Sequence, residues 1–213
     1  MKKPGICESC RSKLPYVQEP RCMKCGKPIS NEEKEYCFDC QKYQLAYDQG
    51  RSVWIQKGNV PRAIYQFKFH NKRYYAETFA EEMADRYAKW IHSCGVEIIL
   101  PVPLHPSKRR SRGFNQAELL AEELGKRVQI PVETEVLFRV KKTRPQKQLS
   151  DKERISNLKQ AFGVSRTWKP KKTVLLIDDI YTTGNTMHRI AKVLKQAGVE
   201  KVYFLTISIG QGL

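Results

Sequence analysis

The stretch LLIDDIYTTGNT, residues 175–186, carries the strongest structural signal in this sequence. An apolar run ends in two adjacent acids, Asp178 and Asp179, and a cluster of Thr, Gly and Asn follows at once. A continuous apolar run is typical of a strand buried in a parallel sheet. The polar cluster suits a turn that leads into a helix, and open α/β sheets bind ligands where their strands end. The stretch therefore predicts a binding site at the tip of a buried strand.

The acids and the turn suit different ends of one ligand. Successive backbone N–H groups and hydroxyls at a helix N-terminus suit a phosphate, which the helix dipole also favours. The two carboxylates are acceptors for vicinal sugar hydroxyls. A 5′-phosphoribose group fits both halves. The residues expected to form the turn are Thr182, Thr183, Gly184, Asn185 and Thr186.

Two other protein classes also place acids at the end of an apolar strand. A receiver-type pocket has its paired acids after the first strand of the domain, with four further βα units to come. Only 35 residues (213 minus 178) follow Asp178. An NTPase needs a G-x-x-x-x-G-K-[ST] loop, which this sequence lacks. Neither class is expected here.

From about residue 46 onward, predicted strands and helices alternate. We expect strands at 51–56, 96–104, 132–140, 173–180 and 202–210, helices at 60–69, 75–91, 115–128, 150–162 and 185–198, and a basic loop at 105–114. Asn115 with Glu118 forms a helix-capping pair, and Gly198 is the usual residue after a helix end. This alternation predicts an α/β fold with an open, mostly parallel sheet.

The N-terminal part is a cysteine array. Six of the seven cysteines form three CxxC pairs, each starting 15 residues after the previous one: Cys7/Cys10, Cys22/Cys25 and Cys37/Cys40. Two CxxC turns complete a tetrahedral zinc site, and a reducing cytosol favours metal over disulfides. We therefore expect a zinc-binding module at residues 1–45, ahead of a second domain at 46–213.

Three pairs exceed what one zinc ion needs. We favour Cys22, Cys25, Cys37 and Cys40 as the zinc ligands, because Gly26 after Cys25 suits a turn whose amides point at thiolate. Cys7 and Cys10 then form a spare pair, or one that exchanges with the site. The set Cys7, Cys10, Cys22 and Cys25 has the same spacing and stays open as the alternative.

The net charge of +17 favours polyanionic partners, nucleic acid first. One cluster of basic residues follows the strand expected at 96–104, and it consists of Lys108, Arg109, Arg110 and Arg112. A second lies between Arg139 and Arg154. Among the aromatic residues beside basic ones, Phe114, Tyr74, Tyr75 and Trp168 are candidates to stack on bases. No apolar run reaches the ~20 residues of a membrane span, and no signal peptide is evident, so we expect a cytoplasmic protein without membrane insertion.

Several motifs together resemble one family. LLIDDIYTTGNT looks like the phosphoribosyl-pyrophosphate signature of type I phosphoribosyltransferases. The three CxxC pairs, FKFHNK (67–72), PVPLHPSKRRSRGFNQAELLA (101–121) and RVKKTRPQKQLSDKERISNL (139–158) extend the resemblance over nearly the full length. With these motifs the chain resembles the ComF/ComFC (ComF/GntX) competence family, in which a Cys-rich zinc module precedes this fold.

The resemblance implies roles for the residues above. Asp178 and Asp179 would bind the ribose hydroxyls of phosphoribosyl pyrophosphate, and residues 182–186 its 5′-phosphate. The cluster at 108–112 would face the pyrophosphate, and Mg²⁺ would arrive with the diphosphate and water. Residues 141–154 fall where these folds carry a loop that closes over the site.

The family role implied is DNA uptake in natural transformation, with single-stranded DNA and the helicase-like ATPase ComFA as partners. The alternative is an active phosphoribosyltransferase that acts on an unidentified base or amine, by displacement of diphosphate from ribose C1. Fold alone does not decide between a binding protein and an enzyme.

Overall fold

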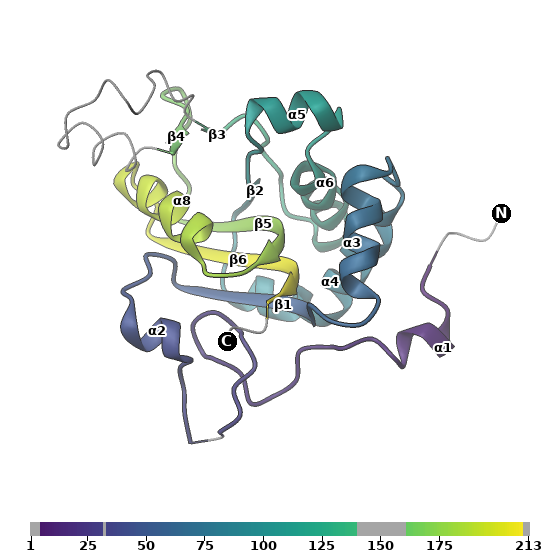
Figure 1. Cartoon of the computed structure of the whole chain (residues 1–213). Coiled ribbons are helices and arrows are strands. Elements are labelled where there is room, and N and C mark those ends of the chain that lie inside the picture. The colour runs from purple at the N-terminus through teal and green to yellow at the C-terminus, as the bar shows by residue number, and fades with distance from the viewer. Residues whose placement is uncertain (1–4, 32, 140–160, 211–213) are drawn as a thin grey trace, which may run out of the picture.

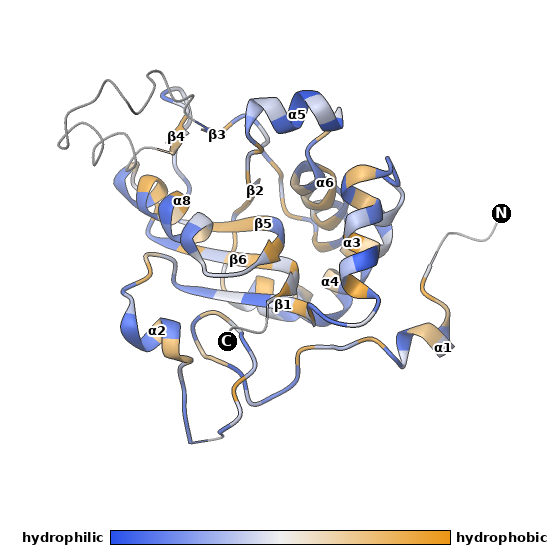
Figure 2. Cartoon of the chain, viewed as in Figure 1, coloured by the Kyte–Doolittle hydropathy of each residue, from blue (hydrophilic) through white to orange (hydrophobic). Residues whose placement is uncertain are grey.

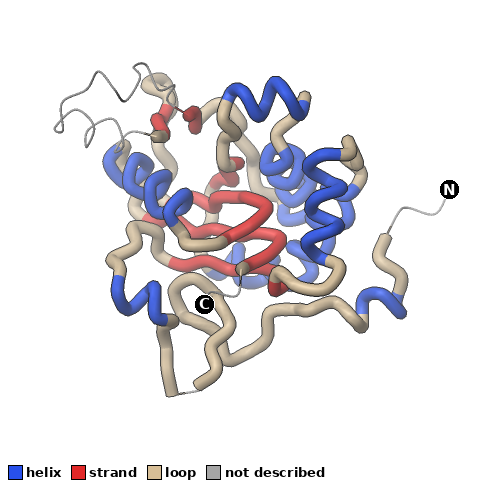
Figure 3. The backbone as a smooth tube through the Cα atoms, viewed as in Figure 1, coloured by secondary structure: helices blue, strands red, loops and turns tan. Residues whose placement is uncertain are grey.

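The structure, a computed structural model, describes residues 5–31, 33–139 and 161–210. Its centre is a four-stranded parallel sheet in the order β1-β6-β5-β2 (Figures 1 and 3). The strands are β1 (Gln49–Ile55), β2 (Ile98–Pro101), β5 (Thr173–Tyr181) and β6 (Lys201–Ile209). The expected open parallel α/β sheet is therefore confirmed, with β5 and β6 in the middle.

Helices cover both faces of this sheet. Residues on β5 alternate between the faces, as a strand requires. Leu175 and Ile177 pack with α3 (Val60–Phe69), α4 (Tyr75–Ser93) and α6 (Gln116–Val128), whereas Val174 and Leu176 pack with α8 (Asn185–Gln196). Figure 2 shows apolar residues interspersed with polar ones along α3, α6 and α8. The core thus lies in two layers, one on each side of the sheet.

The strand, turn and helix predicted from LLIDDIYTTGNT are all present. Strand β5 runs through both acids to Tyr181, and α8 begins at Asn185. Gly198, with φ of 107°, follows the end of α8 as expected. Helix α6 begins after Asn115, whose side chain accepts a hydrogen bond from the Ala117 amide at 3.1 Å. These local signals were read correctly.

The segment expected to be a basic loop at 105–114 is instead a helix, α5 (Pro106–Arg112). The His105 side chain accepts from the Ser107 amide, Pro106 occupies the first turn, and Gly113 ends the helix with φ of 78°. Proline at the start and glycine just after the end are both helix signals. The prediction was wrong because a run of basic residues without apolar periodicity suits a solvated loop, although the two end signals favour a short helix.

Two further expectations need correction. The strand expected at 96–104 is shorter, because β2 ends at Pro101 and Pro103 follows it. The strand expected at 132–140 is split. Val132 forms a parallel bridge to Ile99, while β3 (Leu137–Arg139) pairs antiparallel with β4 (Phe162–Val164) in a separate sheet. Residues 150–160 of the helix expected at 150–162 lie outside the described residues, and Phe162 belongs to β4.

Residues 5–45, which we call the N-terminal ribbon, are mostly loop with two short helices, α1 (Glu8–Arg11) and α2 (Phe38–Lys42) (Figure 3). The ribbon runs along strand β1. The Val17 amide donates to the Val53 carbonyl at 3.0 Å, and the Gly50 amide donates to the Lys24 carbonyl at 2.7 Å. Within the described ranges, none of the helices is both long and apolar enough to cross a membrane.

Candidate functional site

A cavity of about 170 Å³ lies at the carboxyl ends of β5 and β2, and we call it the strand-tip cavity. It brings together parts of the chain that are far apart in sequence. Its lining consists of Lys68, Val102, Pro103, Leu104, His105, Lys108, Arg112, Gln116, Arg139, Asp178, Asp179 and Thr186. Both predicted acids therefore face the same space as part of the predicted turn and part of the basic cluster.

The two acids differ in their surroundings. Asp179 is buried and forms an ion pair with Lys68, Nζ to Oδ2 at 2.8 Å. Asp178 accepts a hydrogen bond from the Asp179 amide at 2.8 Å. Burial, and then the neighbouring Asp179 carboxylate, raise the pKa of Asp178 from 3.8 to about 8. At neutral pH Asp178 therefore tends to keep a proton, which lowers the negative charge beside Asp179.

The turn after β5 has the features that a phosphate site needs. Gly184 adopts φ of 77°, and a Cβ there would lie 2.5 Å from the Tyr181 hydroxyl, so only glycine fits. No side chain caps the N-terminus of α8, which leaves its first amides available to a ligand. Thr186 lines the cavity, and Thr182, Thr183 and Asn185 are exposed on the turn.

The basic cluster on α5 divides between two environments. Lys108 and Arg112 line the cavity, and the Arg112 guanidinium donates to Gln116 Oε1 at 2.6 Å. Arg109 forms an ion pair with Glu118 at 2.6 Å, and Arg110 is exposed outside the cavity lining. Lys108 and Arg112 face the cavity together because residues four apart lie on the same face of a helix, whereas the residues between them point elsewhere. Only half of the predicted cluster is therefore placed to meet a ligand in this cavity.

Two cationic lining residues, Lys68 and Arg139, were not assigned to this site from the sequence. Arg139 is notable because its buried Nε has no hydrogen-bond partner within the described part of the chain, while its guanidinium lies 4.8 Å from the centre of the Phe162 ring. Lys68 and Arg139 both belong to stretches quoted for the family resemblance, 67–72 and 139–158. The family resemblance is therefore the sequence signal that could have identified them. The loop expected at 141–154 lies outside the described residues.

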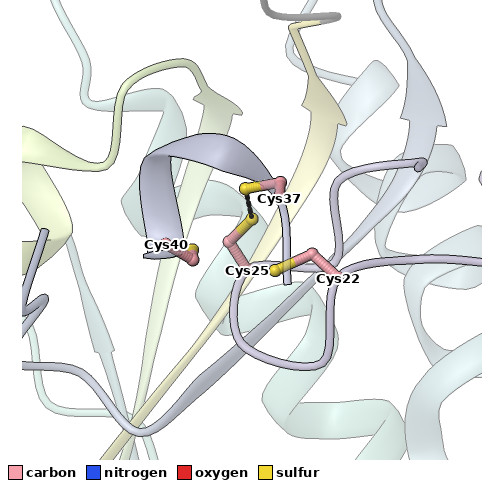
Figure 4. A group of neighbouring side chains, drawn as sticks. All are labelled: Cys22, Cys25, Cys37 and Cys40. Atoms are coloured by element: carbon pink, nitrogen blue, oxygen red, sulfur yellow. Dashed lines mark hydrogen bonds between the residues drawn. The ribbon is translucent and has the colours of Figure 1, made fainter. Parts of the chain in front are cut away.

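The cysteines of the second and third CxxC pairs come together (Figure 4). One sulfur from each of Cys22, Cys25, Cys37 and Cys40 lies within 4.8 Å of the others. Hydrogen bonds from the other three thiols lower the pKa of Cys22, and the same contacts raise that of Cys25. Four cysteine sulfurs this close supply the complete set of donors that a closed zinc site needs.

The remaining pair, Cys7 and Cys10, is exposed at α1 and is not part of this cluster. Its placement favours the first of the two ligand sets that the spacing allowed. Lys27 from the first knuckle and Asp39 from the second form an ion pair at 2.8 Å, which joins the two turns on either side of the four sulfurs.

The segment that follows the ribbon, at Ala46 and Tyr47, contacts both sides of the turn that contains Gly184. The hydroxyls of Tyr47 and Tyr181 lie 2.7 Å apart, both side chains being buried. The Ala46 amide donates to His188 Nδ1 at 3.0 Å on the first turn of α8. The chain leaving the cysteine cluster thus supports both sides of the turn that contains Gly184.

Comparison with known proteins matches this architecture. Residues 1–41 match the double zinc ribbon domain model, and residues 110–208 match the phosphoribosyl transferase domain model. Bacillus subtilis ComFC is 29% identical over 91% of this chain and 79% of its own length. The DNA utilization protein YhgH of Escherichia coli K12 is 27% identical over 93% of this chain and 87% of its own.

Among solved structures, glutamine phosphoribosylpyrophosphate amidotransferase from B. subtilis aligns with 60% of this chain and 26% of its own, at 18% identity and a TM-score of 0.42. Among the sequence relatives, Competence protein F of Haemophilus influenzae is 35% identical over 94% of this chain and 88% of its own length. The chain therefore belongs to the Competence protein F/ComFC family.

Proposed function

We propose that this protein binds phosphoribosyl pyrophosphate, with Mg²⁺, in the strand-tip cavity, and that it handles single-stranded DNA during natural transformation. The observation that carries the first part is the meeting of Asp178 and Asp179 with an uncapped helix N-terminus in one cavity. The carboxylates suit the ribose hydroxyls and the amides suit the 5′-phosphate.

The cations of the cavity suit the rest of this ligand. Lys68, Lys108, Arg112 and Arg139 face the same space as the acids. Basic side chains in a confined site neutralise the charge of a diphosphate. Magnesium would add to them by bridging diphosphate oxygens, because this ion keeps most of its waters and binds through substrate phosphates.

Calorimetry with phosphoribosyl pyrophosphate and Mg²⁺ tests this assignment. The double substitution Asp178→Asn with Asp179→Asn removes both carboxylates and should weaken binding by about a hundredfold or more, equivalent to the loss of two charge-assisted hydrogen bonds. Glu122→Gln, an exposed acid on α6, is the matched control. Cooperative thermal unfolding of each variant verifies the fold. Unchanged affinity in the double variant would remove the ligand assignment.

We place the DNA on a surface beside this cavity, the aromatic–basic patch. Its exposed aromatic residues are Tyr65, Phe69 and Tyr74, at 54%, 57% and 48% exposure. The guanidinium of Arg112 lies 4.7 Å from the centre of the Phe69 ring, and Lys72 lies 6.0 Å from that of Tyr74. Exposed rings beside cations are typical of single-strand binding surfaces.

The structure narrows the aromatic candidates taken from the sequence. Tyr74 is exposed, but Phe114 is buried beneath the Arg73 guanidinium, and Tyr75 is partly buried against Phe79. Trp168 is also partly buried and lines a different cavity. Of the four, Tyr74 alone belongs to the aromatic–basic patch.

Fluorescence polarisation of a labelled oligo-dT strand measures the DNA affinity that this surface should provide. Affinity should fall steeply from low to moderate salt, because phosphate contacts release counterions. Tyr65→Ala with Phe69→Ala should weaken binding about tenfold or more, the effect of losing one stacked base. Phe38→Ala, which removes an aromatic ring 73% exposed on the ribbon, is the control. Salt-independent binding, or equal effects of both changes, would contradict the assignment.

The role and the partner are proposed from the relatives. Competence protein F and ComFC carry competence in their names, and YhgH carries DNA utilization. A ComFA-type helicase-like ATPase is the partner that this role implies. Copurification of the two proteins, with and without single-stranded DNA, checks the association.

A second candidate function, transfer of phosphoribose to an acceptor, rests on the same four cations around the acid pair. They would neutralise a leaving diphosphate as readily as they bind one. Release of diphosphate on addition of candidate bases separates an enzyme from a binding protein. Release that exceeds the rate without protein, and that is lost in the Asp178→Asn variant, would establish catalysis.

A further inference from the structure

A second cavity, of about 480 Å³, lies between the N-terminal ribbon and α4. It shares no lining residue with the strand-tip cavity. Its walls consist of Val17, Gln18, Glu19, Arg21, Arg51, Asp85, Arg86, Tyr87, Lys89 and Trp90. Because four of these side chains are cationic, we call it the arginine cavity.

Arg51, on strand β1, is the central observation. Its residue exposure is 7%, and its guanidinium donates to the Gly50 carbonyl oxygen at 2.9 Å. No carboxylate of the described chain lies within ion-pair distance of this guanidinium. Burial, and then the nearby charge of Arg21, lower the pKa of Arg51. A buried guanidinium offers five N–H donors and is rarely left without an anion.

The other charges of the cavity do not supply that anion. Glu19 is taken by Arg21, whose Nε lies 2.8 Å from its Oε1. Asp85 is 60% exposed and lies 4.0 Å from Arg11. Four cations therefore face two acids, of which Glu19 is paired with Arg21 of the same cavity and Asp85 lies near Arg11 outside the lining. The surplus positive charge is concentrated on Arg51 and on the exposed side chains of Arg86 and Lys89.

The walls are held in place by hydrogen bonds that do not involve a ligand. Tyr87 donates to the Ser52 carbonyl at 2.9 Å, and the Trp90 indole donates to Gln49 Oε1 at 2.8 Å. The Arg51 guanidinium lies 5.5 Å from the centre of the Trp90 ring. Arg86 donates to the Val17 carbonyl at 3.3 Å. The donors are therefore arranged before any ligand arrives.

We propose that the arginine cavity is a second oxyanion site, which binds a phosphate group through Arg51 with Arg21, Arg86 and Lys89 around it. Guanidinium groups match phosphate oxygens in pairs, and a partly buried site strengthens each contact. Free phosphate or nucleotide and the backbone phosphate of a nucleic-acid strand present the same chemistry. The proposal does not rest on the ligand of the strand-tip cavity.

The test is titration of the full-length, zinc-loaded protein with inorganic phosphate and, separately, with an oligo-dT strand, by calorimetry. Arg51→Met removes the buried charge and keeps an unbranched side chain that can fill the space of the arginine stem. Arg86→Gln with Lys89→Gln removes two exposed cations and does not disturb the core. Lys57→Gln, an exposed cation outside both cavities, is the matched control.

We expect Arg51→Met to weaken phosphate binding about tenfold or more, the effect of losing a charged hydrogen-bonding group. The double variant should weaken it by a smaller factor, and Lys57→Gln should leave the affinity unchanged. If the variants lose affinity for inorganic phosphate, the ligand of the arginine cavity is a free phosphate or nucleotide. If they lose affinity for oligo-dT alone, the ligand is a nucleic-acid strand. Affinity for phosphoribosyl pyrophosphate should stay as in the unsubstituted protein. If neither ligand binds more weakly in either variant than in Lys57→Gln, the proposal is wrong. Should Arg51→Met fail to fold, the double variant decides alone.

Discussion

The strand-tip cavity and the arginine cavity are both rich in cations, yet they are built for different tasks. In the first, Lys68 is paired with Asp179, and a second carboxylate stands beside it. In the second, Arg51 has no acid partner in the described chain. A site with both signs of charge selects a ligand that has hydroxyls as well as phosphates, whereas a site with surplus cations selects charge alone.

The cavities also depend differently on the ribbon. One wall of the arginine cavity is the ribbon itself, through residues 17–21. The strand-tip cavity is lined by residues outside the ribbon and is reached from it through Tyr47 and the Ala46–His188 contact. Substitutions and metal removal should therefore affect the two cavities differently.

Metal removal should have the largest effect. Binding of zinc to four cysteines contributes about 10 kcal/mol or more to folding of such a module. Chelation should therefore unfold the ribbon, abolish phosphate binding in the arginine cavity and weaken phosphoribosyl pyrophosphate binding only about tenfold. Calorimetry after dialysis against a chelator measures both affinities.

Two controls accompany this experiment. Added zinc should restore both affinities, and Cys94→Ser, a cysteine outside the cluster, should leave them unchanged. A greater loss for phosphoribosyl pyrophosphate than for phosphate would reverse the comparison between the cavities.

Lys68→Met tests the paired charge of the strand-tip cavity. Removing one partner of a buried ion pair leaves the other uncompensated, and we expect a loss of about 3 kcal/mol in the free energy of unfolding at pH 7. Urea denaturation measures it. Lys72→Met, an exposed lysine four residues later, should cost less than about 0.5 kcal/mol. Equal effects would show that the pair contributes nothing to stability.

Asp178→Asn should make the protein more stable while it weakens ligand binding. The folded-state pKa of Asp178 is about 8, above the ordinary 3.8, so the folded protein keeps a proton that the unfolded chain loses. Stability from this group is full below pH 4 and declines as the pH rises to about 8. Asparagine does not titrate.

The gain from Asp178→Asn should therefore grow from pH 5 to pH 8, by at most about 4 kcal/mol. Urea denaturation at several pH values measures it. Arg51→Met offers the contrast, because arginine stays protonated and its effect on stability should not vary with pH over this range. A gain from Asp178→Asn that is the same at pH 5 and pH 8 would contradict the raised pKa.

Tyr47→Phe should have the smallest effect and should fall on one cavity only. It removes the hydroxyl 2.7 Å from that of Tyr181 and lowers the free energy of unfolding by about 1 kcal/mol. Affinity for phosphoribosyl pyrophosphate should fall a fewfold, because Tyr181 adjoins Gly184, and phosphate binding in the arginine cavity should not change. Tyr43→Phe, on an exposed ring, is the control for both titrations.

The sequence could predict the features that depend on neighbours in the chain. The tip of β5, the turn through Gly184 and the start of α8 are contiguous, so periodicity and turn composition identify them. The pairing of Cys22/Cys25 with Cys37/Cys40 rests on one glycine after Cys25. Helix α5 also has sequence signals for its start and end, Pro106 and Gly113, but the four cations between them favour a loop.

The features that the sequence could not predict depend on contacts across the fold. Lys68 meets Asp179 only because the end of α3 reaches the tip of β5, 111 residues later (179 minus 68). Arg51 looked like an ordinary residue of a strand, and its burial against Trp90 requires the packing of α4 on β1. Single-sequence periodicity has no access to such pairings.

The ribbon also covers one edge of the central sheet. Strands β1 and β2 are its outer strands, and both are covered. Tyr16 forms an antiparallel bridge to Trp54 on one side, and Val132 forms a parallel bridge to Ile99 on the other. An uncovered outer strand is a template for pairing with another molecule. The ribbon thus covers the outer edge of β1, and we expect loss of zinc to be seen first as self-association through β1.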